Sequence, residues 1–132
     1  MSIQFIDSAH KEFFLQKLSQ AEGERKRVDS YFKALIYLCG LTQETRSHFS
    51  SIFDWNDWTI NFECLSAGWQ TGGTARITRL AFNLWNGCGS DDPIGTPISI
   101  EYLPDNIFCC NFMEYFFEAV RLRFSEFNPL YG

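Results

Sequence analysis

The sequence lacks the local motifs that usually reveal a reaction. It contains no G-x-S-x-G turn, no H-E-x-x-H pair, and no Lys-Ser or Lys-Thr after a glycine loop. Because the sequence contains no motif with a defined catalytic role, it predicts a protein that is not an enzyme and needs no cofactor. An enzyme whose Cys–His pair forms only in space, using His10 or His48, stays open as an alternative.

Metal-ligand spacing is also missing. The five cysteines include no C-x2-C pair, and their odd number argues against a complete disulfide framework. We therefore expect no metal and reduced thiols that pack as small apolar groups, with a site from Cys64, Cys88 and one later cysteine as the weaker option. The cysteines are Cys39, Cys64, Cys88, Cys109 and Cys110.

Positive charge is scarce. The chain has 11 Lys and Arg against 16 Asp and Glu, a net charge of -5, and after Arg46 its only cations are four arginines. Direct binding to nucleic acid needs a basic face, which this composition does not supply. An acidic chain instead suits docking onto the basic surface of another protein.

Long apolar runs are absent too. No run approaches the roughly 20 residues of a membrane span. The N-terminal stretch MSIQFIDSAHKEFF carries acids and has no signal-peptide core. We therefore expect a cytoplasmic protein without membrane contact.

Aromatic residues, by contrast, are plentiful. They make up 17% of the 132 residues, with 14 phenylalanines, and hydrophobic residues make up 45%. This composition predicts one domain, residues 1–132, with a core dominated by rings. The fold class that we expect is mainly α, about five helices around this core, with a small β-hairpin as an addition and an α+β fold as the alternative.

Helix boundaries can be predicted from capping residues. The first helix should end near Gly23, the second at Gly40, the third at Phe53, the fourth at Gly87 and the last near Phe124. The basic turn at 23–27 should be solvated. The hairpin would pair segments near 58–62 and 97–102. The expected starts are Asp7 or Ser8, Asp29, Thr42, Thr74 and Asn111, the last in an N-x-x-E pattern with Glu114.

The stretch GWQTGGTARITRLAFNLWNG at 68–87 allows two interpretations. In the first, Thr74 caps a core helix and Arg79 on its polar face pairs with Glu118 of the last helix. In the second, backbone N–H groups at the glycines bind a phosphate or nucleotide. The residues of that alternative site are Thr71, Gly72, Gly73, Thr74 and Arg76.

Tryptophans beside acids in irregular segments indicate a protein-binding surface. Trp55, Trp58 and Trp69 lie in or beside loops, and the alternative is that they fill the core from the loop side. We expect the partner surface to combine the 54–63 segment with the acidic loop 91–105. Its residues are Asp54, Trp55, Asp57, Trp58, Asp91, Asp92, Glu101 and Asp105.

Several blocks of the chain resemble a family that is found on conjugative elements and phages of low-GC Gram-positive bacteria. The blocks are FIDSAHKEFF, DSYFKALIYLCGLTQETRSH, IFDW…INFECLSAG, WQTGGTARITRLAFNLWNG and IFCCNFMEYFFEAVRLRF. The loop 88–104 and the basic turn match this pattern least. The resemblance implies a setting in a bacterial host and transfers no residue role.

Small, acidic, motif-free proteins on such elements often inhibit host defence, and anti-CRISPR proteins are among them. The resemblance thus implies a binding protein that blocks a host effector, a CRISPR nuclease with a basic groove being the expected partner. The second function left open is binding of a phosphate or nucleotide ligand at 71–76.

Overall fold

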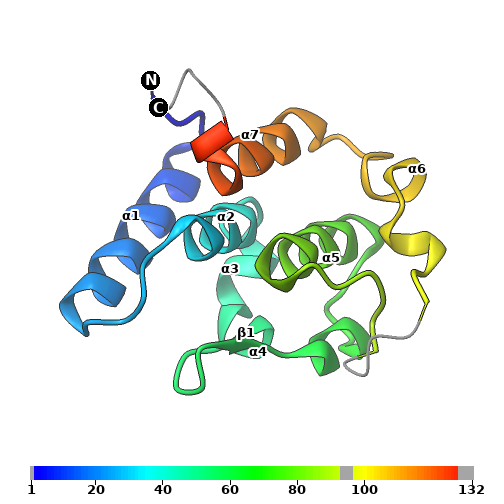
Figure 1. Ribbon diagram of the computed structural model, residues 1–132, viewed down its shortest axis with the longest axis horizontal. Helices are drawn as coiled ribbons and strands as arrows, with labels where there is room; N and C mark the ends of the chain where they lie inside the picture. Colours follow the sequence, from blue (N-terminus) through cyan, green and yellow to red (C-terminus); the bar gives the residue numbers. More distant parts are fainter. Residues whose placement is uncertain (1, 93–96, 128–132) are drawn as a thin grey trace.

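A computed structural model describes residues 2–92 and 97–127. Over these residues the protein is mainly α-helical, as the sequence predicts, with seven α-helices, three 3-10 helices and one two-stranded sheet (Figure 1). The α-helices are α1 (Ser8–Gly23), α2 (Ser30–Cys39), α3 (Gln43–Ser47), α4 (Phe49–Ile52), α5 (Gly72–Asn86), α6 (Pro104–Ile107) and α7 (Met113–Arg123). The remaining elements are β1 (Phe53–Asp54), β2 (Thr59–Ile60), η1 (Phe62–Ser66), η2 (Ile100–Tyr102) and η3 (Ser125–Phe127).

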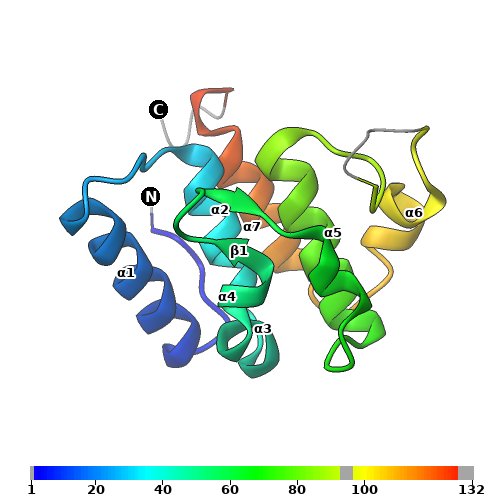
Figure 2. The ribbon, with the colours of Figure 1, turned by 90° about the horizontal axis from the view of Figure 1, so that it is seen from below.

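Helix α2 is the central element. All its residues from Ala34 to Cys39 are buried, and so is Phe32. A helix that is apolar on every side needs neighbours on every side. Helices α1, α5 and α7 pack against it, and Figures 1 and 2 show α2 enclosed by them.

The core is aromatic, as expected. Its largest fully buried side chains include Tyr37, Phe32, Phe53, Phe82 and Phe116. Packing is close where α1 crosses the end of α2. A Cβ on Gly40 would lie 2.8 Å from Cδ2 of His10, so this position admits no side chain without a shift of the ring.

Several helix ends agree with the predicted caps. Asp7 accepts a hydrogen bond from the His10 N–H at 2.8 Å, and Asp29 accepts one from the Phe32 N–H at 3.0 Å. Thr42 caps α3, and Gly87 ends α5 in the left-handed region with φ +78°. These ends are local events, which is why sequence spacing finds them.

Three predicted boundaries are wrong. The expected third helix is broken at His48 into α3 and α4. Helix α5 starts at Gly72, because Thr71 rather than Thr74 is its N-cap. Thr74 Oγ1 in turn accepts a hydrogen bond from the Thr71 N–H at 2.7 Å. Helix α7 follows Phe112 rather than Asn111 and has no side-chain cap.

The predicted hairpin is also wrong in its pairing. Strand β1 pairs antiparallel with β2, with Phe53 opposite Ile60 and Asp54 opposite Thr59. The segment expected to pair from the distal loop instead contains the 3-10 turn η2. Closing a four-residue loop costs less chain entropy than closing one of several tens of residues, which favours the local pair.

The part of the chain that the structure describes contains no helix long and apolar enough to cross a bilayer.

Candidate functional site

The tryptophan hairpin, residues 53–60, has a tightly specified loop. Asp54 Oδ1 accepts hydrogen bonds from the N–H groups of Asn56 and Asp57, both at 3.0 Å. Trp58 closes the loop with φ +56°, in the left-handed region that bulky residues rarely adopt. Such a conformation costs on the order of 1–3 kcal/mol and persists only where the surroundings enforce it.

Ring packing supplies that enforcement. The Trp58 ring stacks on Phe32 with centroids 4.7 Å apart and planes at 26°, and it meets Phe53 edge-on at 5.1 Å. Its Nε1 is nevertheless buried without a hydrogen-bond partner among the described residues. Two unfavourable features therefore meet at one residue of the hairpin, which is typical of binding sites.

Trp55 connects the hairpin to the turn after α1. Its Nε1 donates to Glu24 Oε1 at 2.9 Å, and Lys26 Nζ lies 5.7 Å from the Trp58 ring centroid. The hydrogen bonds from Trp55 and then Gln20 lower the pKa of the Glu24 carboxyl. The turn at 23–27 is mostly exposed, as predicted, and it also contacts this site through Glu24 and Lys26, which sequence reasoning missed. An indole N–H needs an acceptor, but the sequence does not say which one.

A hollow of about 400 Å³ lies at the hairpin. Asp54 contributes one carboxylate oxygen, Oδ2, that has no hydrogen bond within the described chain, since the loop uses Oδ1. Amides and rings complete the lining. The hollow is lined by Ser50, Phe53, Asp54, Trp55, Asn56, Thr59, Ile60 and Asn61.

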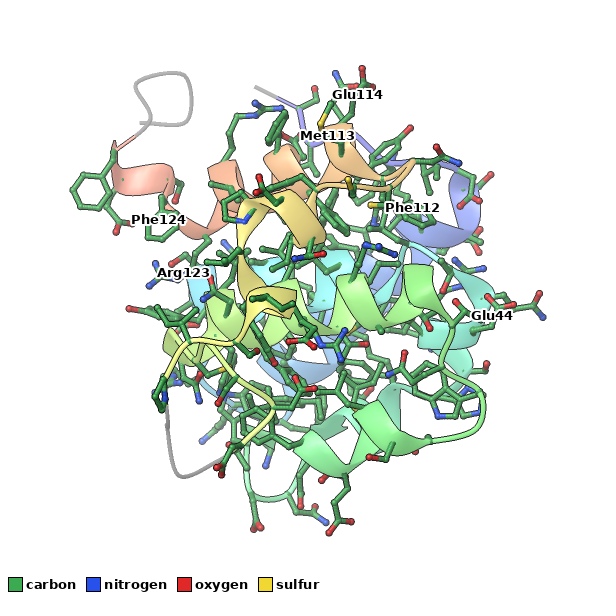
Figure 3. The ribbon with its side chains drawn as sticks, turned by 90° about the vertical axis from the view of Figure 1, so that its right-hand side faces the viewer. Glu44, Phe112, Met113, Glu114, Arg123 and Phe124 are labelled. Atoms are coloured by element: carbon green, nitrogen blue, oxygen red, sulfur yellow. The ribbon has the colours of Figure 1, made fainter. Side chains whose placement is uncertain are left out.

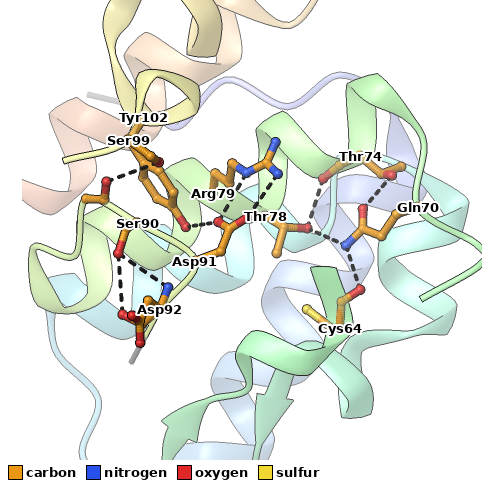
Figure 4. A network of polar contacts seen from close by, with 11 residues as sticks. Cys64, Gln70, Thr74, Thr78, Arg79, Ser90, Asp91, Asp92, Ser99 and Tyr102 are labelled. Atoms are coloured by element: carbon orange, nitrogen blue, oxygen red, sulfur yellow. Dashed lines mark hydrogen bonds and ion pairs between the residues drawn. The ribbon is translucent and has the colours of Figure 1, made fainter. Parts of the chain in front are cut away.

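The second predicted patch is built differently. Arg79 donates to both oxygens of Asp91, Nε to Oδ1 at 3.2 Å and Nη2 to Oδ2 at 3.0 Å. The Tyr102 hydroxyl donates to Asp91 Oδ1 at 2.8 Å, and Figure 4 shows both donors directed at this carboxylate. Burial raises the pKa of Asp91, but the bonds from Arg79 and Tyr102 outweigh it, so the pKa is lowered. Asp91 therefore holds the loop after α5 in place.

The predicted pair between Arg79 and Glu118 is wrong. Glu118 is buried and instead accepts from Arg121 Nε at 3.1 Å and from the Gln4 N–H at 2.7 Å. Asp91 is nearer along the chain to Arg79 and satisfies its guanidinium in bidentate geometry.

The two halves of the predicted partner surface pack on different elements. The hairpin packs on α4, whereas η2 and α6 pack on α5. Figures 1 and 2 place the hairpin on the α1–α2 side and α6 beyond α5. Glu101 and Asp105 are exposed on that far side, Asp92 is half-buried, and residues 93–96 of the acidic loop lie outside the described residues.

The glycine stretch at 71–76 serves the fold. Arg76 donates from Nε to the Asn106 carbonyl at 2.7 Å and from Nη1 to the Gly72 carbonyl at 3.1 Å. Gln70 bridges the Cys64 carbonyl and Thr78 Oγ1, each at 3.3 Å (Figure 4). The arginine and the cap are thus already engaged with the chain itself.

The thiols and imidazoles are kept apart. Burial raises the pKa of Cys39, that of Cys64 to about 12 and that of Cys88 to about 11, which lowers the thiolate fraction that a nucleophile needs. Both ring nitrogens of His10 are engaged, with the Tyr37 carbonyl at 2.7 Å and the Ile6 N–H at 3.1 Å.

His48 stacks on Trp69 with centroids 4.5 Å apart. In the described ranges no hydrogen bond joins a cysteine to a histidine, and no group of three or more His, Cys, Asp or Glu residues could hold a metal ion.

Two exposed apolar side chains that the sequence analysis did not single out lie at the ends of the C-terminal helix. Met113 begins α7 and Phe124 follows its last residue, and they are 45% and 40% exposed (Figure 3). Beside Phe124, the Arg123 guanidinium lies 3.4 Å from the Tyr31 ring centroid and donates to the Leu84 carbonyl at 2.9 Å. Arg123 therefore ties α7 to α5 and α2.

The fold and these sites define a mainly α protein with an aromatic core and a tryptophan hairpin packed on it. Residues 1–129 match the model of a family described as a family of unknown function (DUF6075), and the chain belongs to that family. Neither the search of curated proteins nor the search of solved structures returned a match.

Proposed function

We propose that this protein is a non-enzymatic inhibitor that binds a host defence effector, a guide-loaded CRISPR nuclease in the first instance. Its contact surface is the tryptophan hairpin. The observation that supports this is the hollow of about 400 Å³, in which Asp54 and two asparagine amides lie beside the Phe53 and Trp55 rings.

This lining matches the chemistry of an arginine side chain. A carboxylate oxygen accepts from the guanidinium, and an aromatic ring offers its face to the same cation. The basic groove with which a nuclease holds nucleic acid presents such side chains. The net charge of -5 would favour encounter with that groove.

The partner class comes from the resemblance to proteins of conjugative elements and phages, whose small acidic members often block host defence. The exposed Asp57 at the tip of the loop adds a second acid to this surface.

The test is DNA cleavage in vitro by a panel of purified, guide-loaded CRISPR nucleases, with and without the protein. We expect cleavage by one class to stop near equimolar inhibitor. Asp54→Asn keeps an oxygen that can accept from the N–H groups of the loop but removes the negative charge, so it should weaken inhibition about tenfold or more. Asp105→Asn, the same change beyond α5, is the matched control and should inhibit like the parent protein. Full inhibition by Asp54→Asn would contradict the assignment, as would a complete lack of inhibition across the panel.

A phosphate or nucleotide site at residues 71–76 is the weaker candidate. Arg76 already donates to two carbonyls, and Thr71 and Thr74 bond to each other's N–H groups.

A further inference from the structure

A second cleft lies between α1 on one side and α3, α4 and β1 on the other, and it adjoins the hollow at the hairpin, with which it shares Ser50, Phe53 and Trp55. Figure 2 shows these elements facing each other. Its volume is about 310 Å³, at the small end of the range typical of small-molecule sites. Its lining residues are Lys17, Gln20, Arg46, Ser47, Phe49, Ser50, Phe53 and Trp55.

Two cations line this cleft, one from each wall. Lys17 Nζ lies 5.6 Å and 5.3 Å from the ring centroids of Phe13 and Phe49, which hold the ammonium in place. Arg46 donates from Nη1 to the Gly40 carbonyl at 2.7 Å. Both side chains are only partly exposed.

Neither cation forms an ion pair with a carboxylate in the part of the chain that the structure describes. Lys17 contacts rings and Arg46 contacts one carbonyl, so neither positive charge is neutralised by an acid, and the pair offers the charge that an anionic ligand needs. The hydroxyl of Ser50 and the amide of Gln20 supply further polar groups beside them.

Trp55 gives the cleft lining an aromatic part. Its Nε1 and the Gln20 amide both donate to Glu24, at 2.9 Å and 3.1 Å. The Glu24 carboxylate would repel an anionic group placed beside Trp55. A ligand would therefore place its anion at Lys17 and Arg46 and a flat ring at Trp55.

We propose that this cleft binds a mononucleotide, with the phosphate between Lys17 and Arg46 and the base against Trp55. Stacking on an aromatic side chain tolerates any base, because every base has a π-face. The site differs from the proposed inhibitor surface in its two cations, although Trp55 lines both.

The test is isothermal titration calorimetry of the whole protein with AMP, adenosine and inorganic phosphate at low salt. AMP should bind at least about tenfold more tightly than either fragment, because each fragment forms only one of the two contacts. Lys17→Gln and Arg46→Gln should each weaken AMP binding by about tenfold or more, since each removes a charge-assisted contact. Lys11→Gln, on an exposed position of the same helix, is the matched control and should bind AMP like the parent protein.

Circular dichroism and thermal melts of each variant separate loss of the ligand contact from loss of the fold. No heat with millimolar AMP, or an equal loss in Lys11→Gln, would overturn the proposal. Phosphate binding as tight as AMP binding would overturn the proposed contact between the base and Trp55. A 5′-phosphorylated oligonucleotide that binds far more tightly than AMP would overturn a mononucleotide site in favour of nucleic-acid ends.

Discussion

The tryptophan hairpin and the loop after α5 both carry acids in irregular backbone, yet they are held by different means. The hairpin is held by ring packing around Trp58, together with two backbone N–H bonds to Asp54. The loop is held by the polar contacts of Asp91 with Arg79 and Tyr102. Asp91 pairs with an arginine and is partly neutralised, whereas Asp54 accepts only from backbone N–H groups of its own loop and keeps its charge uncompensated by a cation within the described residues. Local acidity in a sequence therefore does not by itself mark a binding surface.

The largest expected effect is on the aromatic side of this comparison. Trp58→Ala should lower the free energy of unfolding by about 3 kcal/mol, because the stack on Phe32 is lost and alanine keeps the unfavourable backbone conformation. Urea unfolding measures it. Trp58→Phe keeps the stacking and removes the unpartnered N–H, so it should stay within about 1 kcal/mol of the parent protein. A loss below about 1 kcal/mol in Trp58→Ala would show that ring packing does not hold the hairpin.

A smaller effect is expected on the polar side. A double-mutant cycle with Arg79→Gln and Asp91→Asn should give a coupling of about 1 kcal/mol, discounted because the Asp91 side chain is 41% exposed. High salt should reduce this coupling and leave the effect of Trp58→Ala almost unchanged. Equal salt sensitivity at both sites would remove the contrast between them.

Acid should separate the two regions further. The pKa of Asp91 is lowered on folding, so the carboxylate stabilises the protein above its unfolded pKa, and this stabilisation is lost as the pH falls through the folded pKa. The stability difference between the parent protein and Asp91→Asn should be constant above about pH 5 and shrink below about pH 4. Both proteins share His10, whose pKa burial lowers, so its own acid destabilisation cancels in the difference. Chemical unfolding from pH 3 to pH 7 provides the measurement, and a difference that does not change with pH would disprove the role of the carboxylate.

The smallest effect is expected at the tip of the hairpin. Asp57 is exposed, and its side chain makes no hydrogen bond within the described residues. Asp57→Asn should change the free energy of unfolding by less than about 0.5 kcal/mol. Thermal melts beside Asp91→Asn make the comparison direct. A larger loss would mean that the tip acid, like Asp91, serves the fold.

Predictions from the sequence succeeded where the cause is local. Asp7, Asp29, Thr42 and Gly87 end or begin helices through contacts within a few residues, so spacing and residue type suffice. The prediction of α5 erred by two residues because two threonines compete for the cap, and only the packed helix shows which one takes it.

Predictions of contacts between residues far apart in the sequence failed where several partners of the right chemistry exist. The guanidinium of Arg79 could form an ion pair with any nearby carboxylate, and the fold brings Asp91 to it rather than Glu118. Trp55 needed an acceptor, and the packing of α1 supplies Glu24 from 31 positions away.

The sequence alone determined the helical class, the aromatic core and most helix ends, because hydrophobic periodicity and capping act over a few residues. Only the tertiary structure decided which acids pair with a cation, which cations line one cleft, and that the hairpin packs on α4 whereas η2 and α6 pack on α5. Charge and ring chemistry are readable residue by residue, but pairing depends on which elements pack together. That choice is made by burial of the apolar faces around α2.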